Sequence, residues 1–207
     1  MSWPYVDYDS DLWMKIPTAW EGTPWKGSKQ WAQYMAEAWW GDSDFRPSRK
    51  DLKGLVATLR ECAERLPATH PGFDVYLHLP DPRFMPLPVY VAAIEADGDR
   101  DRTLKGWVSG HDADLVEQPV VEDFGTEMLG SGLKSLRYTR LGDGREIVAG
   151  VRYAWRSEEC RCDIVVVVSA PDPRRVVGAM DDLDAFVGRI TLTPPRADLD
   201  PSSETPG

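Results

Sequence analysis

Residues 48–67 have the hydrophobic period of an amphipathic α-helix. Apolar residues recur there every three or four positions, and charged residues fill the positions between them. The apolar stripe consists of Leu52, Leu55, Val56, Leu59, Cys62, Ala63 and Leu66. Ser48 and Asp51 have the spacing of a capping box, and Pro67 is expected to end the helix. The pattern predicts a helix of about 17 residues.

Two more segments have a helical period. The first begins near Ser28 and ends at Gly41. Its apolar face contains Trp31, Tyr34, Met35, Ala38 and Trp39. The second is expected to begin at Pro173, with Asp172 as its N-cap. Its apolar stripe contains Val176, Val177, Met180, Leu183, Val187 and Ile190. We expect this helix and the one that begins near Ser48 to cover the same face of a sheet.

Alternation of apolar and polar residues predicts β-strands between these helices. The expected strands are residues 73–79, 89–96, 133–141, 147–155 and 160–168, with a further strand at 103–110 that would pair back as a hairpin. His78 is expected on the polar face of the first strand. A Gly-Asp-Gly turn at 142–144 and a second short turn at 157–159 would join the last three strands into an antiparallel meander.

The remaining segments are expected to be irregular. The proline-rich stretch 80–88 has to be a loop or a sheet edge, because proline lacks the N–H that a central strand needs. Residues 97–102 indicate a turn, and residues 111–131 a loop with at most one helical turn. Residues 1–27 show no period and are expected to be an extended or looped segment held by its aromatic rings.

The order of the elements predicts an α+β fold. We expect a curved antiparallel sheet of about five or six strands with helices packed against it, as an α/β/α sandwich. The main domain would span residues 48–193, and residues 1–47 would form a Trp-rich N-terminal segment with one helix packed on that domain. Residues 194–207 have the composition of a disordered tail.

Composition narrows the class of partner. The net charge is −10, and Lys and Arg form no stripe, so nucleic acid and anionic membranes are not expected partners. A basic protein remains a candidate, because an acidic surface steers cationic molecules toward it. No segment has the pattern of a signal peptide or a membrane span, so a cytoplasmic location is expected. Arg far outnumbers Lys, which is typical of GC-rich bacterial genomes such as those of actinobacteria.

The sequence predicts no catalytic residue, no cofactor and no metal site. Cys160 and Cys162 would share the core face of a strand, and Cys62 is distant in the sequence, so the cysteines suggest buried packing. The histidines His70, His78 and His111 have no recognisable partners, although His111 lies in a predicted loop that could border a site. No nucleophile, zinc-binding or phosphate-binding motif is present, which favours a non-enzymatic role without excluding an enzyme.

Tryptophan is the most unusual feature of the composition. Seven of the nine tryptophans lie in the first forty residues. These rings could attach an irregular segment to the domain, or some could form a surface for a partner, since tryptophan is enriched at binding hot spots. The candidate partner-binding residues are Trp20, Trp25, Trp39, Trp40, Phe84 and Met85.

The stretch from about Ser48 to Thr193 resembles the Mog1/PsbP-like fold family. The resemblance is carried by three meander strands, a short proline-containing link and a final amphipathic helix that ends with Asp184, Phe186 and Ile190. It implies an α/β/α sandwich on a curved antiparallel sheet. Members of the family mostly bind other proteins, as adaptors, assembly factors or chaperones, and they share no catalytic motif.

Three functions are compatible with the sequence. The first is a non-enzymatic bacterial adaptor or chaperone, for example for a secreted effector or a secretion system. The second is an immunity protein whose acidic surface neutralises a basic toxin. The third is an enzyme or small-ligand protein with a pocket beside the sheet, near the loops at residues 80–88 and 111–131.

Overall fold

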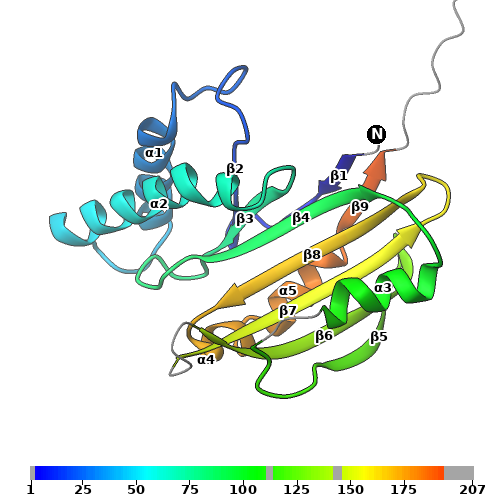
Figure 1. Ribbon diagram of the computed structural model, residues 1–207. Helices are drawn as coiled ribbons and strands as arrows, with labels where there is room; N and C mark the ends of the chain where they lie inside the picture. Colours follow the sequence, from blue (N-terminus) through cyan, green and yellow to red (C-terminus); the bar gives the residue numbers. More distant parts are fainter. Residues whose placement is uncertain (1–2, 111–113, 142–145, 194–207) are drawn as a thin grey trace, which may run out of the picture.

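A seven-stranded antiparallel β-sheet forms the centre of the molecule (Figure 1). A separate two-stranded sheet pairs the first strand of the chain with the last. The computed structural model describes residues 3–110, 114–141 and 146–193. The strands are β1 (Trp3–Val6), β2 (Trp13–Ile16), β3 (Asp74–His78), β4 (Leu87–Glu95), β5 (Val120–Thr126), β6 (Gly130–Leu141), β7 (Glu146–Ser157), β8 (Cys162–Ala170) and β9 (Ile190–Thr193). The order in the large sheet is β2-β3-β4-β8-β7-β6-β5, and β1 pairs with β9. The predicted α+β class is confirmed, with more strands than expected.

Helices cover both faces of the large sheet. They are α1 (Ser28–Gly41), α2 (Arg49–Thr69), α3 (Arg100–Ser109), α4 (Pro173–Val177) and α5 (Met180–Val187). Val75 and Leu77 of β3 pack in one cluster with residues of α1 and α2, whereas Tyr76 packs in another with Phe186 of α5. The prediction that the helices beginning near Ser48 and Pro173 share a face is therefore wrong. No helix in the described part of the chain is long and apolar enough to cross a membrane.

The sheet is buried on both faces at β3, which corrects the expectation for His78. All five residues of β3 are buried, because α5 covers the face that the alternation assigned to solvent. His78 lies beneath α5, where its Nε2 is 2.9 Å from Asp182 Oδ2 and its ring lies 4.6 Å from that of Trp13. Asp182 thus replaces water as the partner of Nε2, whereas Nδ1 is buried without a hydrogen-bond partner in the described part of the chain.

The meander expected in the C-terminal third is present. Ala149, Val151, Tyr153 and Trp155 of β7 are fully buried on the face covered by α4 and α5, as their alternation predicted. Ile147 is 39% exposed, near the start of the strand. The Gly-Asp-Gly turn expected at 142–144 lies outside the described residues, and so does the tail from residue 194 onward.

The N-terminal segment is more regular than predicted. Residues 13–16 form β2, which pairs with β3 and contributes Trp13 to one face of the sheet and Met14 and Ile16 to the other. Residues 3–6 form β1, whose partner β9 follows α5. Each strand has only four residues, too few to establish a period, and both depend on a partner distant in the sequence.

Residues 100–109 form a helix and not the hairpin strand expected at 103–110. Asp99 caps α3 by accepting a hydrogen bond from the Arg102 backbone N–H at 2.9 Å. Leu104 and Val108, four residues apart, are buried against Ala154 of β7. The spacing of four was present in the sequence, but the segment is short and its other residues also fit a strand.

Three further segments differ from the predictions. Residues 111–131 contain β5 and the start of β6, where a loop was expected; β5 escapes a pattern search because it is an edge strand whose residues are mostly exposed. The single helix expected after Asp172 is divided at residues 178–179 into α4 and α5, and Ile190 belongs to β9. In α2 the Ser48–Asp51 capping box is confirmed, but the helix continues to Thr69 through Pro67, which lies in its last turn.

Trp31 is the most completely buried tryptophan of α1, at 1% exposure. We expect Trp31→Ala to lower the free energy of unfolding by about 3–5 kcal/mol, because it leaves a cavity between α1 and the rest of its core cluster. Urea unfolding followed by circular dichroism measures this change. Trp25→Ala is the matched control and should cost less than half as much, since Trp25 is only half-buried. Equal losses would contradict the assignment of Trp31 to the core.

His78 should make stability depend on pH. Burial and the nearby Arg175 guanidinium lower the pKa of His78 to about 4, although Asp182 opposes the shift. Below the ordinary pKa of about 6.5, the unfolded chain binds a proton that the folded chain does not, so stability falls as the pH drops toward 4. Above that ordinary value the contribution of His78 is fully present.

The expected slope from His78 is at most about 1.4 kcal/mol per pH unit. Urea unfolding between about pH 7 and 5 measures it as the difference between the wild type and His78→Asn, which should show the weaker dependence. His70→Asn, at an exposed histidine, is the matched control for the loss of an imidazole. A His78→Asn profile parallel to that of the wild type would refute the assignment.

Candidate protein-binding surface

The indole of Trp39 joins the end of α1 to the segment that follows β3. Its Nε1 donates a hydrogen bond to the Leu79 carbonyl oxygen at 2.7 Å. The Leu79 backbone N–H in turn donates to the Leu12 carbonyl oxygen at 2.9 Å. The segment before β2, the last turn of α1 and the segment after β3 are distant in the sequence, and these two hydrogen bonds hold them next to one another.

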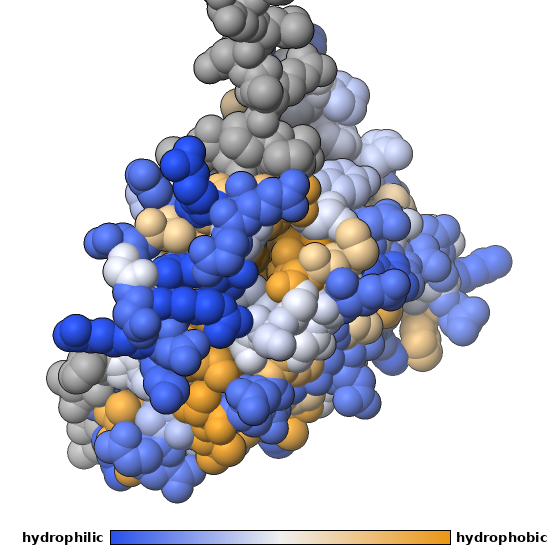
Figure 2. All heavy atoms as spheres, turned by 90° about the vertical axis from the view of Figure 1, so that its right-hand side faces the viewer, coloured by the Kyte–Doolittle hydropathy of each residue, from blue (hydrophilic) through white to orange (hydrophobic). Residues whose placement is uncertain are grey.

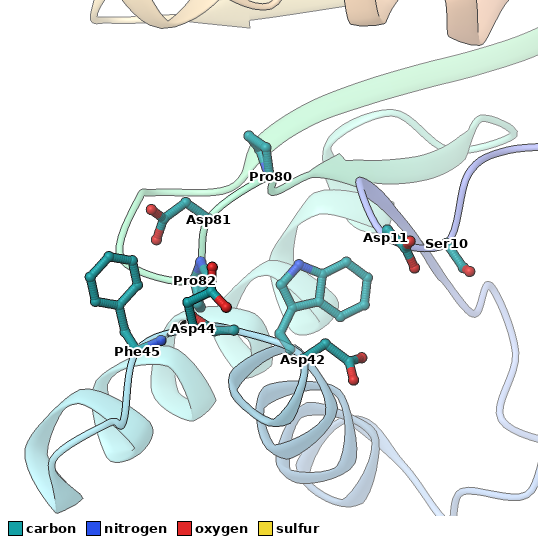
Figure 3. A pocket seen from close by; sticks show the side chains of 10 residues that line it. Ser10, Asp11, Asp42, Asp44, Phe45, Pro80, Asp81 and Pro82 are labelled. Atoms are coloured by element: carbon teal, nitrogen blue, oxygen red, sulfur yellow. Dashed lines mark hydrogen bonds between the residues drawn. The ribbon is translucent and has the colours of Figure 1, made fainter.

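These segments enclose a pocket of about 590 Å³ (Figure 3). Its lining consists of Ser10, Asp11, Trp39, Asp42, Ser43, Asp44, Phe45, Pro80, Asp81 and Pro82. Figure 3 shows Ser10 and Asp11 on one side of the pocket, Phe45 and Asp81 on the other, and Asp42 between them at the end of the helix. The pocket thus combines aromatic rings with four carboxylates.

The negative charge of this pocket is only partly neutralised. Arg83 Nε donates a hydrogen bond to Asp81 Oδ1 at 2.9 Å. Hydrogen bonding to Arg83 holds the pKa of Asp81 below its usual range. Within the described ranges, Asp11, Asp42 and Asp44 form no ion pair with Lys or Arg. Asp42 is also the C-cap of α1, where the helix macrodipole is negative and a carboxylate is unfavourable. The pocket is therefore suited to a cationic group.

An apolar patch adjoins the acidic pocket. It consists of Phe45, Phe84 and Met85, which are 49%, 54% and 68% exposed. The Arg83 guanidinium lies 3.7 Å from the centre of the Phe45 ring. Phe84 and Met85 border a second hollow, of about 500 Å³, between α2 and their loop, and this hollow shares Phe45 with the acidic pocket. A single partner segment could therefore contact the patch and the carboxylates together.

The structure separates the predicted partner-binding residues into two groups. Trp39, Trp40, Phe84 and Met85 line the two adjoining hollows, although Trp40 is largely buried, at 7% exposure. Trp20 and Trp25 are half-buried and pack beside α1, against Trp31 and Tyr34 respectively. They line neither hollow.

Sequence reasoning did not identify the acidic residues or Phe45. Asp42, Asp44 and Phe45 follow α1 directly, so the run Gly-Asp-Ser-Asp-Phe was the available signal. Asp11 and Asp81 belong to other segments, and only the folded chain shows that they face the same pocket.

The edge strand β5 also exposes apolar side chains. Val120 and Val121 are exposed there, and Figure 2 shows the side of the molecule toward which β5 lies, with apolar side chains in small groups among polar ones. Glu122 and Asp123 interrupt this strand, and charged side chains are a common protection of sheet edges against unwanted pairing. Protection of the sheet edge is thus a sufficient explanation for the charged residues of β5.

The cysteines and histidines do not form a reactive centre in the described part of the chain. Cys162 is buried as predicted, whereas Cys160 lies half-buried in the turn before β8 and not within a strand. Burial raises the pKa of Cys62 to about 11, which keeps it a thiol at neutral pH. No three metal-binding side chains are grouped among the residues described, and His111 lies outside them.

Trp39→Phe tests the hydrogen bond that holds the pocket together. Phenylalanine keeps most of the ring but cannot donate, so we expect a loss of about 1–2 kcal/mol in the free energy of unfolding. Amide hydrogen exchange should also become faster at Phe84, whose N–H donates to Asp81 O in the same loop. Trp20→Phe is the control, since Trp20 Nε1 has no hydrogen-bond partner within the described ranges. An unchanged exchange rate at Phe84 would show that the loop is held by other contacts.

A scan against models of protein families and a search of curated proteins each gave no match for this chain.

Proposed function

We propose that the chain is a non-enzymatic bacterial adaptor or chaperone that binds a segment of another protein. The segment would carry a basic side chain next to an apolar one. The single observation that carries the proposal is the adjacency of the acidic pocket to the exposed patch of Phe45, Phe84 and Met85.

The charge of the pocket favours a cation. Asp42 and Asp44 repel each other and the negative end of α1, so a Lys or Arg of the partner would relieve an existing repulsion as well as form new ion pairs. The Trp39 ring would provide an apolar wall for the methylene part of such a side chain.

The apolar patch would supply the remainder of the binding energy. Phe84 and Met85 border the hollow beside α2, and an apolar side chain of the partner would fill it. Methionine suits such a surface because its unbranched side chain adapts to different shapes. Arg83, held by Asp81 and lying over Phe45, would keep the boundary between the two hollows fixed.

Two further observations support an adaptor or chaperone. The resemblance of residues 48–193 to Mog1/PsbP-like proteins points to the same class of function. Cys62, Cys160 and Cys162 form no disulfide, which suits the reducing cytoplasm in which we place this role.

An immunity protein is the second candidate, and the carboxylates favour it. Asp11, Asp42, Asp44 and Asp81 could cover the basic active site of a toxin. In that case charge would dominate, and Phe84 and Met85 would contribute little. The salt dependence of binding distinguishes the two functions, because an apolar contact persists at high ionic strength and an exposed ion pair does not.

Selection from a displayed library of random peptides tests the proposal. Peptides enriched on the wild-type chain should combine Lys or Arg with a large apolar residue. Their affinity should fall about tenfold on Asp42→Asn/Asp44→Asn, which corresponds to the loss of about 1.4 kcal/mol. Phe84→Ser/Met85→Ser should weaken the same peptides, and binding should survive in high salt.

Glu158→Gln/Glu159→Gln is the matched control. It removes the same charge from an exposed turn between β7 and β8, and it should leave the affinity unchanged. Enrichment of peptides without a cation, or equal weakening by the control, would refute the adaptor surface. Binding that is abolished by salt and insensitive to Phe84→Ser/Met85→Ser would support the immunity function instead.

A further inference from the structure

The outer face of α1 and α2 carries a second groove, distinct from the acidic pocket. Two hollows of about 560 and 670 Å³ adjoin there and share Lys29, Gln33 and Val56. Leu52 and Val56 of α2 are half-buried along it, and Tyr34 of α1 is exposed at one end. The groove therefore has an apolar floor that no described element covers.

The rim of this groove is basic, although the chain as a whole is acidic. Its cations are Lys26, Lys29, Arg49, Lys53 and Arg60, and its carboxylates are Glu37, Glu61 and Glu64. All three carboxylates already have partners.

Side chains of the same two helices engage these carboxylates. Arg65 Nη1 donates to Glu61 at 2.6 Å, and Arg60 Nε donates to Glu64 at 2.7 Å. Glu37 accepts a hydrogen bond from Gln33. Within the described ranges, Lys26, Lys29, Arg49 and Lys53 form no ion pair, so an incoming molecule would meet these four cations, and it would also meet Glu37, whose charge the Gln33 amide does not neutralise.

The N-terminal end of α1 adds to this positive potential. Gly27 is the N-cap and supplies no side-chain acceptor, and the first turn contains no acidic residue. Lys26 and Lys29 lie at this end, where the macrodipole is already positive, so both are placed unfavourably for the helix alone. An anionic group of a partner would compensate them.

From these observations we propose that the α1–α2 groove binds an acidic amphipathic helix of a partner protein. A third helix can lie along two packed helices. Its apolar residues at positions i, i+3 or i+4 and i+7 would then contact Leu52 and Val56. Glu or Asp residues beside that stripe would face Lys29 and Lys53 across the groove. A helix of about 16 residues would be about 24 Å long, which is enough to follow α1. The proposal does not depend on the acidic pocket.

A displayed library of helix-forming peptides of about 16 residues, with varied surface positions, tests the proposal. Peptides enriched on the full-length chain should have an apolar stripe flanked by Glu or Asp. Their affinity should fall at least about tenfold on Lys29→Glu/Lys53→Glu. Exchanging Glu for Lys in an enriched peptide should restore binding to that variant, an effect that general damage to the fold cannot produce.

Arg102→Glu/Lys105→Glu on α3 is the matched control, because it reverses two exposed cations on another helix and should leave the affinity within about twofold. Enriched peptides that lack acidic residues, or that bind the groove variant as well as the wild type, would overturn the proposal. Tighter binding of duplex DNA or of anionic vesicles through Lys29 and Lys53 would overturn it too. So would binding of the peptides only after removal of residues 194–207, which would make the chain's own tail the occupant.

Discussion

The hydrogen bond from Trp39 Nε1 to the Leu79 carbonyl oxygen fixes the geometry on which the proposed binding surface depends. It links the last turn of α1 to the point where β3 ends, and β3 is held in the sheet by neighbours on both sides. The loops that follow α1 and β3 therefore meet over the same pocket. A binding surface formed by two loops needs such an anchor, because unanchored loops would lose conformational entropy on binding.

Most of the described N-terminal tryptophans have a packing or anchoring role. Trp13, Trp31 and Trp40 are buried, Trp39 makes the anchoring hydrogen bond, and Trp20 and Trp25 cover the flank of α1. Trp31, Trp39 and Trp40 attach α1 to the edge of the sheet formed by the short strand β2, a task that suits large rings, whereas Trp13 packs on the opposite face of the sheet against Phe186. The exposed apolar patch beside the acidic pocket consists instead of phenylalanine and methionine from the two loops.

The sequence predicted the elements that have a long apolar period on one face only. It failed where the period was short or where both faces of a strand are buried. The apolar stripe of α2 and the alternation of apolar and polar residues in β7 were sufficient to predict these two elements. In β3, the same alternation led to an error at His78, because a polar residue in a strand can face a second helical layer if it finds a partner such as Asp182. β5 was missed because an exposed edge strand has little apolar pattern. For the binding surface, Phe84 and Met85 were identified from a proline-rich loop, whereas Asp11 and Asp81 converge only through the tertiary fold.

The charges around α1 indicate that stability alone did not shape this helix. Lys26 and Lys29 lie at its positive end, and Asp42 and Asp44 at its negative end, so both pairs reinforce the macrodipole where stability would favour the opposite signs. Each such charge costs a few tenths of a kcal/mol, up to about 1 kcal/mol. Residues that oppose local stability without a compensating contact are typical of functional surfaces. A helix charged in this way attracts an anion at its N-terminal end and a cation at its C-terminal end. A protein that joins two partners of opposite charge requires the same arrangement.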